Sequence, residues 1–394
     1  MNNTPFPSPL RFGSLGLAPM EGVSDYATRF WFYLNANPPF MSTPFLRATD
    51  SYPGKLPEKF APELTTLKQR SPYKLVTQIM ASCPEAFSRT AEHILPHTPT
   101  VDLNCGCPSP KSVGRRAGAS LIMDPDSFGT FLDRIVQNVG PGVLSVKTRL
   151  GYYESSEFLR LREVLSHFPL HHLSIHGRTR VQRYSGDAHW PSIMDAGSTL
   201  PFPVIGSGDI SDRLTFQSRH HPAVAAVMIG RGALRNPWIF LEIKNNRPVH
   251  LPYETLKISL ASFAILGSVF THDFPSLVKL VEEGLGESPP LTCSQQWTHI
   301  YHKLTHAHLG HDHSPYELPF GGKNLGRVKM LWHYIRSSLS PAFHNPQILR
   351  SKNFLEFFQR LDAAYQLHAQ EFPGDLELSY QPHLNHLYGT RPQN

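Results

Sequence analysis

The 394-residue chain has few charged residues, few cysteines and no long run of apolar residues. Only 17% of its residues are charged, which excludes a disordered tail protein built on acidic or basic runs. Its four cysteines (Cys83, Cys105, Cys107 and Cys293) lack the spacing of a small disulfide-stabilised secreted domain. The start of the chain has no basic segment followed by an apolar one, and no run of about 18 apolar residues exists. We therefore expect no signal peptide, no membrane partner and a reducing cytoplasm.

The composition is that of a folded protein with a basic surplus. Hydrophobic residues make up 40% of the chain, enough for a sizeable buried core. The formal net charge of +6 suits a polyanionic partner, although it fits many other proteins too.

Short apolar segments alternate with helical stretches in the N-terminal part of the chain, and this order predicts a (β/α)8 TIM barrel. Most are rich in Val, Ile and Leu on both faces, as strands covered on both sides are. An open doubly wound sheet is the alternative, but it requires a Gly-rich turn after the first strand, where this chain reads PMEG. Helices are expected at Pro125–Asn138 and Glu157–His167. The expected strands are Leu15–Ala18, Phe40–Phe45 (interrupted by Pro44), Lys74–Ile79, Val101–Asn104, Val143–Thr148, His172–His176, Val204–Ser207 and Ala225–Gly230.

The pattern changes after about Arg247, where Pro248 and Pro252 mark a linker. We expect a catalytic barrel over residues 1–247 and a helical domain over 248–394, with an insertion near 270–322. Within it, residues 286–322 are rich in Pro, His, Gly and Ser. The helices expected in the second domain are Tyr253–Phe270, Phe274–Leu285, Leu325–Leu339 and Asn353–Glu371.

Polar residues and glycines gather where seven of the eight expected strands end. In a (β/α)8 barrel these ends share one rim, where active sites form. The glycines after strands seven and eight allow backbone N–H groups to approach a phosphate, and Arg231 adds a forked cation. The residues are Pro19, Met20 and Glu21, then Gln78, Asn104 to Pro108, Lys147 and Arg149, His176 to Arg178, Ser207, Gly208 and Asp209, and Gly230, Arg231 and Gly232.

Cys107 is the candidate general acid, because a thiol with an ordinary pKa of about 8.5 is mostly protonated at neutral pH and still gives up its proton. Cys105 has neither zinc-site nor redox-pair spacing, so we expect it in the core. Lys147 is a Schiff-base nucleophile, a flavin partner or an ion-pair member. His176 is either functional or a structural hydrogen-bonding residue, and Gln78 either contacts a heterocycle or closes a loop.

Two further clusters lie in the C-terminal part. His306, His308, His311 and His313 lack a recognised metal-ligand spacing, so we expect a flexible polar loop and no metal site. No Asp or Glu occurs between Leu318 and Leu355, where basic residues and Trp332 and Tyr334 interleave. That composition suits RNA contacts, or else a helix with a solvated basic face and Trp332 in the core. The RNA-binding candidates are Lys323, Arg327, Lys329 and Arg336.

Several motifs resemble those of the tRNA-dihydrouridine synthases. They are LAPMEGVSD (17–25), DLNCGCPSP (102–110), GASLIMDP (118–125), SVKTRLG (145–151), SIHGRTRVQRYSGDAHW (174–190), GSGDI (206–210) and MIGRGAL (228–234). GRVKMLWHYIR (326–336) resembles the RNA-binding helical domain of the bacterial C-type branch.

This resemblance implies a bound FMN, NADPH as reductant and tRNA as substrate. It also implies reduction of a uridine in the D loop, with position 16 as the candidate. We expect a monomer without a stable protein partner. Cys107 matches the family's catalytic cysteine and proton donor. The implied cofactor-binding residues are Pro19, Met20, Glu21, Gln78, Lys147, His176, Ser207, Gly208, Asp209, Gly230 and Arg231. Ser207 stands where the family usually has Asn.

Three other functions compete with this interpretation. A flavin-dependent TIM-barrel reductase of a free pyrimidine or enone explains the cofactor residues but not the basic aromatic helix. A Schiff-base aldolase would use Lys147. A catalytically silent RNA-binding protein would leave Cys107 unexplained.

Overall fold

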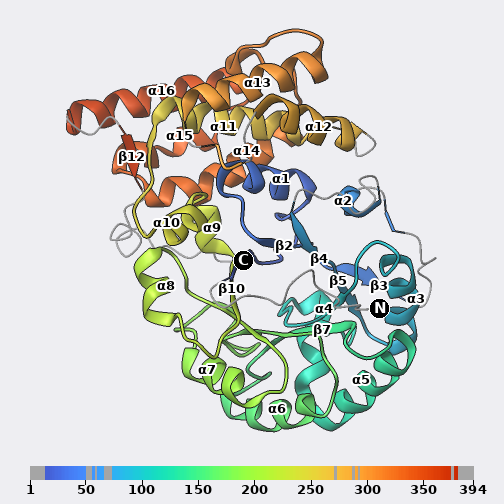
Figure 1. Ribbon diagram of the computed structural model, residues 1–394. Helices are drawn as coiled ribbons and strands as arrows, with labels where there is room; N and C mark the ends of the chain where they lie inside the picture. The colour runs from blue at the N-terminus through green and yellow to red at the C-terminus, as the bar shows by residue number, and fades with distance from the viewer. Residues whose placement is uncertain are drawn as a thin grey trace. The chain divides into compact units, whose positions relative to one another are not determined.

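The computed structural model describes residues 14–49, 56–57, 60–65, 73–269, 273–285, 289–291, 293–373 and 377–379 (Figure 1). The chain folds into two compact units. The first unit contains the residues up to Tyr26, Pro38–Ile210 and Gln217–Gly230. The second contains Ala27–Asn37, Ser211–Phe216 and the chain from Arg231 onward. The chain passes between the units more than once, so this division has no single boundary. The predicted domain boundary near residue 247 stays a prediction.

The first unit is a closed parallel barrel. Its strands pair in the order β3-β5-β6-β7-β8-β9-β10-β1-β2-β4, and all neighbours are parallel. Only Thr77 separates β4 from β5, so the two ends of this order meet and the sheet closes. The strands are β1 (Ser14–Leu17), β2 (Phe40–Ser42), β3 (Leu46–Ala48), β4 (Lys74–Val76), β5 (Gln78–Ala81), β6 (Val101–Cys105), β7 (Leu144–Arg149), β8 (Leu173–His176), β9 (Val204–Ser207) and β10 (Ala226–Ile229). The predicted TIM-barrel fold is thereby confirmed.

Two of the eight barrel strands are interrupted, which corrects the continuous strands expected at Phe40–Phe45 and Lys74–Ile79. The first breaks between β2 and β3 around Pro44, which has no N–H for a ladder bond. The second breaks at Thr77 and continues to Ala81. The breaks face each other: Thr43 N donates to Val76 O (3.0 Å), and Gln78 N donates to Thr43 Oγ1 (3.0 Å). Where the two breaks meet, the Thr43 hydroxyl thus replaces part of the backbone hydrogen bonding between the strands.

The barrel interior contains one apolar cluster. Phe40, Val76, Ile205, Ala226 and Met228 form one buried cluster with Ala18, each at most 6% exposed. Glycine at position 16 is required there, because a Cβ would lie 2.2 Å from the Phe40 ring. The interior is therefore packed with side chains, and the rim at the carboxyl ends of the strands is the place for chemistry.

Helices cover the outside of the barrel strands, as Figure 1 shows for α3 (Pro84–Ile94), α5 (Pro125–Val139), α6 (Phe158–Ser166) and α7 (Trp190–Thr199). Asp124 caps α5 by accepting from the N–H groups of Asp126 and Ser127, which confirms the predicted helix start. Shorter helices are α2 (Pro62–Thr65), α4 (Pro110–Val113) and the 3-10 segments Gly118–Met123 and Ser155–Glu157.

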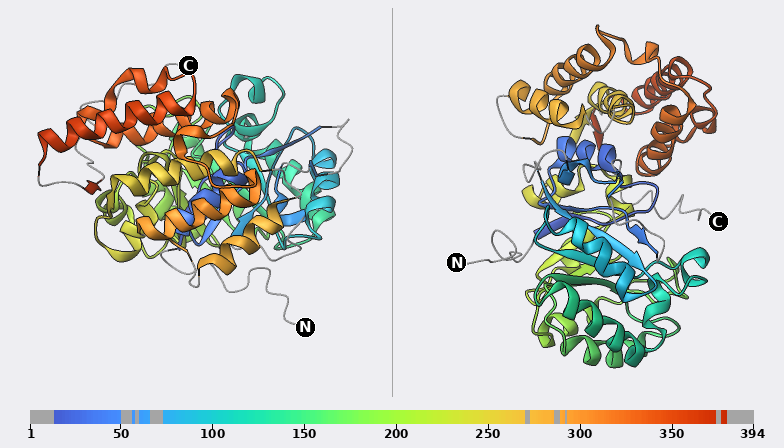
Figure 2. Two further views of the ribbon diagram at one scale, coloured as in Figure 1. Left: turned by 90° about the horizontal axis from the view of Figure 1, so that it is seen from above. Right: turned by 90° about the vertical axis from the view of Figure 1, so that its right-hand side faces the viewer.

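The second unit consists mainly of helices, shown from two further sides in Figure 2. Its core contains Trp31, Trp297 and Trp332, all fully buried. Helix α1 (Tyr26–Ala36) belongs here except for its first residue, since Trp31 packs on Phe263 at 5.6 Å between ring centroids. The other elements are α9 (Arg231–Arg235), α10 (Ile239–Asn245), α11 (Tyr253–Leu266), α12 (Phe274–Leu285), α13 (Ser294–Leu309), α14 (Gly322–Ile335), α15 (Pro346–Leu349), α16 (Phe354–Glu371), and an antiparallel pair of β11 (His250–Pro252) and β12 (Glu377–Ser379). Helix α8 (Arg213–Arg219) has residues in both units.

Helix α13 corrects the flexible loop expected around His306 and His308, whereas His311 and His313 lie beyond its end at Leu309. Trp297, Ile300, Tyr301 and Leu304 are buried at helical spacing, and His306 and His308 lie in the last turn of this helix. Apolar burial therefore outweighs the polar composition. No helix in the described part of the chain is long and apolar enough to cross a membrane. Among the same residues, no three His, Cys, Asp or Glu side chains are grouped so as to hold a metal ion.

Candidate functional site

The predicted site residues of the first unit lie at the carboxyl ends of its strands. Cys107 follows β6, Lys147 lies in β7, and His176 ends β8. Ser207 ends β9, and Gly208 and Asp209 follow it. Gly230 follows β10, while Arg231 begins α9 and belongs to the second unit. The barrel thus brings the predicted residues of the first unit to one rim.

Cys107 is held by a chain of side-chain hydrogen bonds that begins inside the barrel. Asn104 Oδ1 accepts from the backbone N–H of Gly106 (3.1 Å) and of Cys107 (2.9 Å). Asn104 Nδ2 donates to Gln78 Oε1 (2.6 Å), and Gln78 Nε2 donates to Asp102 Oδ2 (2.6 Å). Because a carboxylate can only accept, Asp102 sets the orientation of the Gln78 amide and through it that of Asn104.

The other side of the Cys107 loop is held as closely. Ala119 N donates to Cys107 O (3.1 Å), and the Cys107 Sγ lies 3.4 Å from Ser112 Oγ. The thiol is half-buried, whereas Cys105 is fully buried, as predicted. Gly118, with φ +64°, packs against Cys107, because a Cβ there would lie 3.1 Å from its Cβ and O atoms. The thiol therefore stands on a backbone with little freedom to shift.

Lys147 brings a poorly solvated cation to the rim. Burial, and to a lesser extent the charge of Arg149, lowers the pKa of Lys147 to about 8, although Asp102 opposes the shift. Burial raises the pKa of Asp102 to about 6 despite the hydrogen bonds from Gln78 and Ser145. Within the described residues Lys147 makes no hydrogen bond or ion pair. Its ammonium is therefore available to a bound anion or electron-rich ring.

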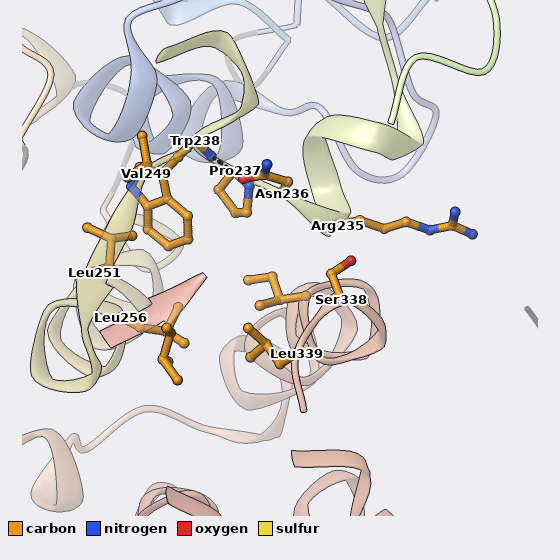
Figure 3. Close-up of a pocket in the computed structure, with 11 residues that line it drawn as sticks. Arg235, Asn236, Pro237, Trp238, Val249, Leu251, Leu256, Ser338 and Leu339 are labelled. Atoms are coloured by element: carbon orange, nitrogen blue, oxygen red, sulfur yellow. Dashed lines mark hydrogen bonds between the residues drawn. The ribbon is translucent and has the colours of Figure 1, made fainter. Parts of the chain in front are cut away.

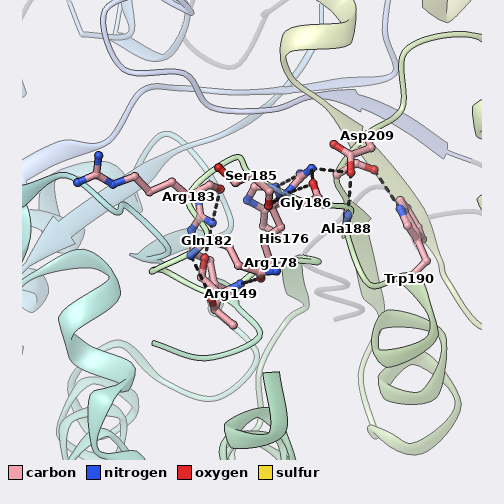
Figure 4. Close-up of polar contacts among 12 residues, drawn as sticks. Arg149, His176, Arg178, Gln182, Arg183, Ser185, Gly186, Ala188, Trp190 and Asp209 are labelled. Atoms are coloured by element: carbon pink, nitrogen blue, oxygen red, sulfur yellow. Dashed lines mark hydrogen bonds and ion pairs between the residues drawn. The ribbon is translucent and has the colours of Figure 1, made fainter. Parts of the chain in front are cut away.

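Arg149 connects two rim loops, a role that its place in the sequence did not indicate. Its side chain is 2% exposed, and Nε donates to Gly106 O (2.7 Å). Nη1 donates to the carbonyls of Thr179 and Arg183, both at 2.9 Å (Figure 4). One guanidinium thus joins the loop before Cys107 to the loop after β8. A cation at the end of a strand is the only sequence signal for it.

His176 begins a second polar chain, drawn in Figure 4. Its Nε2 lies 3.4 Å from Arg178 Nη1, and Arg178 Nη2 pairs with Asp209 Oδ2 at 2.7 Å. The same carboxylate oxygen accepts from Ala188 N at 2.7 Å. The Asp209 side chain is therefore used within the protein, so a phosphate would meet only backbone N–H groups at this residue.

The backbone after β10 and β1 is not crowded at Gly230. A Cβ on Gly230 would make only ordinary contacts, 3.7 Å from Ala18 Cβ and 3.8 Å from Met20 Sδ. No atom of the described residues thus requires glycine there, and its bare backbone is open to a ligand. Met20 is held in a turn by Ser24, whose Oγ accepts from Met20 N (2.8 Å). With the Lys147 ammonium, this donor set fits a flat, phosphorylated cofactor.

Of the remaining cofactor candidates, Pro19 is half-buried beside Met20, and Glu21 is exposed in the same turn. Ser207 is 8% exposed at the end of β9. Gln78 is fully buried, and both ends of its amide are bonded within the protein. Direct contact of these residues with a cofactor stays a prediction.

The four RNA-binding candidates lie on or next to α14, and three of them make contacts inside the second unit. The Arg327 guanidinium stacks over Phe263 at 5.2 Å from the ring centroid. Lys329 Nζ donates to Ser351 O, and Arg336 Nη1 donates to His344 O, both at 3.0 Å. Lys323 is exposed. Their role in RNA binding stays a prediction.

A small cavity of about 20 Å³ lies within the second unit (Figure 3). Its walls include Trp238, Leu251, Leu256 and Leu339. That volume suits about one water molecule, so this cavity is not a cofactor site.

Comparisons with known proteins agree with the motifs. The family model Dihydrouridine synthase (Dus) matches residues 16–261, more than half of the chain. The tRNA-dihydrouridine(16) synthase of Cupriavidus necator is 34% identical over 240 residues, covering 58% of this chain and 73% of that protein. The protein of the same name from Escherichia coli is 32% identical over 238 residues, covering 59% and 76%.

Among solved structures, morphinone reductase overlaps 59% of this chain and 86% of its own, with a TM-score of 0.44 and 10% identity. The family match and the Cupriavidus relative establish membership at the level of sequence. The chain therefore belongs to the dihydrouridine synthase family.

Proposed function

We propose that this protein reduces the C5–C6 double bond of a uridine in the D loop of tRNA, with FMN as cofactor and NADPH as reductant. The observation that carries the proposal is the thiol of Cys107, held at the same barrel rim as the poorly solvated cation of Lys147. The Cupriavidus and Escherichia relatives are named for position 16, which we propose as the target here as well.

The residues proposed to hold FMN belong to the barrel rim. Lys147 would lie against the ring, and the backbone around Gly208 and Gly230 would receive the phosphate. When bound, FMN supplies the hydride that uracil C6 receives, having been reduced by NADPH. The Lys147 ammonium would stabilise negative charge on the reduced ring system.

Cys107 would supply the proton that C5 needs. As hydride enters at C6, negative charge moves toward C5 and O4 of the uracil, and the Sγ–H bond breaks to form the C5–H bond. The resulting thiolate lies 3.4 Å from Ser112 Oγ, which can donate a hydrogen bond to it until solvent returns a proton. Overall, the uracil gains one hydride and one proton, and NADPH is oxidised to NADP+.

A uridine within folded RNA is stacked, so it must leave its stack to reach this rim. We therefore propose that the substrate is the folded tRNA rather than the free nucleoside. The decisive experiment is mass spectrometry of tRNA from cells that lack the protein. We expect position 16 to lack the two added hydrogens. Unchanged dihydrouridine at every position would refute the proposal, and equal activity of the purified protein on free uridine would favour a small-molecule reductase.

Replacing the proposed proton donor tests the chemistry. We expect Cys107→Ala to bind flavin normally, seen as a yellow protein, but to reduce tRNA about 100-fold more slowly or worse. Cys293→Ala is the control. Cys293 is exposed in the second unit, so this variant should retain full activity. Full activity of Cys107→Ala would disprove the proton-donor role.

A further inference from the structure

We propose that exposed cations on two rim loops of the barrel form the surface that binds the RNA backbone next to Cys107. The surface consists of Lys111, Arg115, Arg116 and Arg183, with Tyr184 at its inner edge, and is called the basic rim. This inference rests on the proposed function and names the part of the molecule that holds its RNA.

The two loops of the basic rim are neighbours. The Arg149 guanidinium joins them, because it donates to Gly106 O on one loop and to Arg183 O on the other, at 2.7 and 2.9 Å. Lys111 lies four residues after Cys107, in the short helix α4. The two loops that carry the cations are therefore joined at Gly106, the residue before Cys107.

The cations of the basic rim are free to meet a ligand. Lys111, Arg115, Arg116 and Arg183 are exposed. Within the described chain, none of them is paired with an Asp or Glu. The sequence favours this, because no acidic residue occurs from Leu103 to Met123 or from Val164 to Gly186. Figure 4 shows the Arg183 side chain directed away from the Arg178–Asp209 pair.

Two of the cations stand on unusual backbone. Arg116 has φ +51° and Arg183 has φ +50°, a conformation that residues with a Cβ rarely adopt. Such conformations persist where surrounding contacts enforce them, and they are common at functional sites. Here they lie in the two loops that Arg149 joins.

Tyr184 adds an aromatic surface. Its side chain is 55% exposed, and its ring lies 6.2 Å from the His176 ring. The Arg149 guanidinium covers the ring at 5.7 Å, which keeps it in place. An exposed ring among exposed cations is the arrangement that binds single-stranded segments, with stacking for bases and charge for phosphates. Four cations without acidic neighbours suit the polyanionic backbone of RNA.

The candidates on α14 contrast with the basic rim. Arg327, Lys329 and Arg336 contact Phe263, Ser351 and His344 inside the second unit. Among the described residues, the four cations of the basic rim make no such side-chain bonds within the protein. We therefore assign the larger share of phosphate binding to the barrel unit.

The test compares the salt dependence of tRNA binding in two charge-matched variants of the full-length holoenzyme. One is K111Q/R115Q/R116Q/R183Q. The control is R89Q/R134Q/R160Q/R162Q, which removes four positive charges from the outer helices α3, α5 and α6. Binding of unmodified tRNA is measured between 50 and 300 mM KCl, and thermal unfolding checks that both variants fold. Over roughly this range of salt concentration, the release of counterions changes the affinity for tRNA measurably.

We expect the slope of log Kd against log salt to fall by about 3 in the rim variant, since each phosphate that is no longer neutralised lowers it by about 0.7 to 0.9. Its Kd should rise about tenfold or more at 100 mM salt, while the control keeps the wild-type slope. Equal slopes in all three proteins would overturn the basic rim while leaving the proposed function intact. If wild-type protein itself showed no salt-dependent tRNA binding, the proposed function would fail instead.

Tyr184 is tested separately. Tyr184→Phe keeps the ring and should bind tRNA as the wild type does, whereas Tyr184→Ala should weaken binding about fivefold or more without changing the salt slope. Wild-type affinity in Tyr184→Ala would remove the aromatic residue from the surface.

Discussion

At the scale of single residues, the structure explains how an ordinary loop can present a thiol reproducibly. The backbone N–H of Cys107 is bound by Asn104, and its carbonyl by Ala119. Asn104 in turn is oriented by Gln78 and Asp102. A general acid works only within hydrogen-bonding reach of its target atom, so this fixation of the backbone is part of the chemistry.

Gly118 is a sensitive test of that fixation. We expect Gly118→Ala to destabilise the protein by about 1–3 kcal/mol, because a Cβ is strained at φ +64° and meets Cys107 at 3.1 Å. The rate of uridine reduction should fall more than the flavin content. Gly326→Ala in α14 is the control: its Cβ meets nothing within 4 Å, so it should stabilise the protein by about 0.5–1 kcal/mol. Chemical unfolding and single-turnover rates provide both measurements.

Lys147 should give the reaction a pH limit. Since burial lowers the pKa of Lys147 to about 8, its stabilising charge is present below that pH and is lost above it. We expect the single-turnover rate to decline above about pH 8. In Lys147→Arg, whose guanidinium stays protonated, this decline should be absent. A decline that persists in Lys147→Arg would belong to another group.

Single residues also show where sequence-based inference stops. The rim position of Cys107 and the burial of Cys105 could both be predicted from strand patterns and residue type. The bonds of Gln78 could not, because its partners Asp102 and Asn104 lie on a neighbouring strand. Composition likewise could not tell that Lys329 and Arg336 bond inside their own unit, whereas Lys111 lies exposed on a rim loop.

At the scale of elements, strands buried on both faces were the easiest to predict. β9 spans Val204–Ser207, as predicted, because an apolar run bounded by turn residues leaves one interpretation. The interrupted strand around Pro44 was harder to predict. Its hydrogen bonds are completed by the neighbouring strand at the break around Thr77, which the sequence does not reveal. Helix α13 was missed because its histidines hide an apolar stripe.

Helix α16 offers a test at this scale. Asn353 caps α16 by accepting from Glu356 N at 2.8 Å. We expect Asn353→Ala to lower the free energy of unfolding by about 1 kcal/mol, because the N–H group loses its partner. Asn353→Asp keeps the acceptor and should change little. Urea unfolding followed by helical circular dichroism measures both, and equal stability of the alanine variant would contradict the cap.

At the scale of the whole molecule, two adjacent histidines make stability depend on pH. Burial lowers the pKa of His171 to about 4, and burial together with His171 lowers that of His172 to about 3. The unfolded chain takes up these protons near pH 6.5, so the folded state binds fewer protons below that pH. We therefore expect the free energy of unfolding to fall as the pH drops from about 6.5 toward 4.

Comparison with His172→Leu isolates this effect. Asp102 acts in the opposite direction, because its raised pKa of about 6 lets the folded state keep a proton that the unfolded chain loses. Urea unfolding at several pH values should show a flatter acid dependence in His172→Leu than in the wild type. Parallel curves would mean that these rings do not control acid stability.

The packed interior of the barrel has a consequence for turnover. Phe40, Val76 and Met228 belong to the apolar cluster that fills the interior, so we expect both reactants to enter from the rim. For the proposed reaction, we expect the nicotinamide and the uracil to use this same entrance one after the other. NADPH would then reduce the cofactor and leave before the tRNA binds, so we expect ping-pong kinetics.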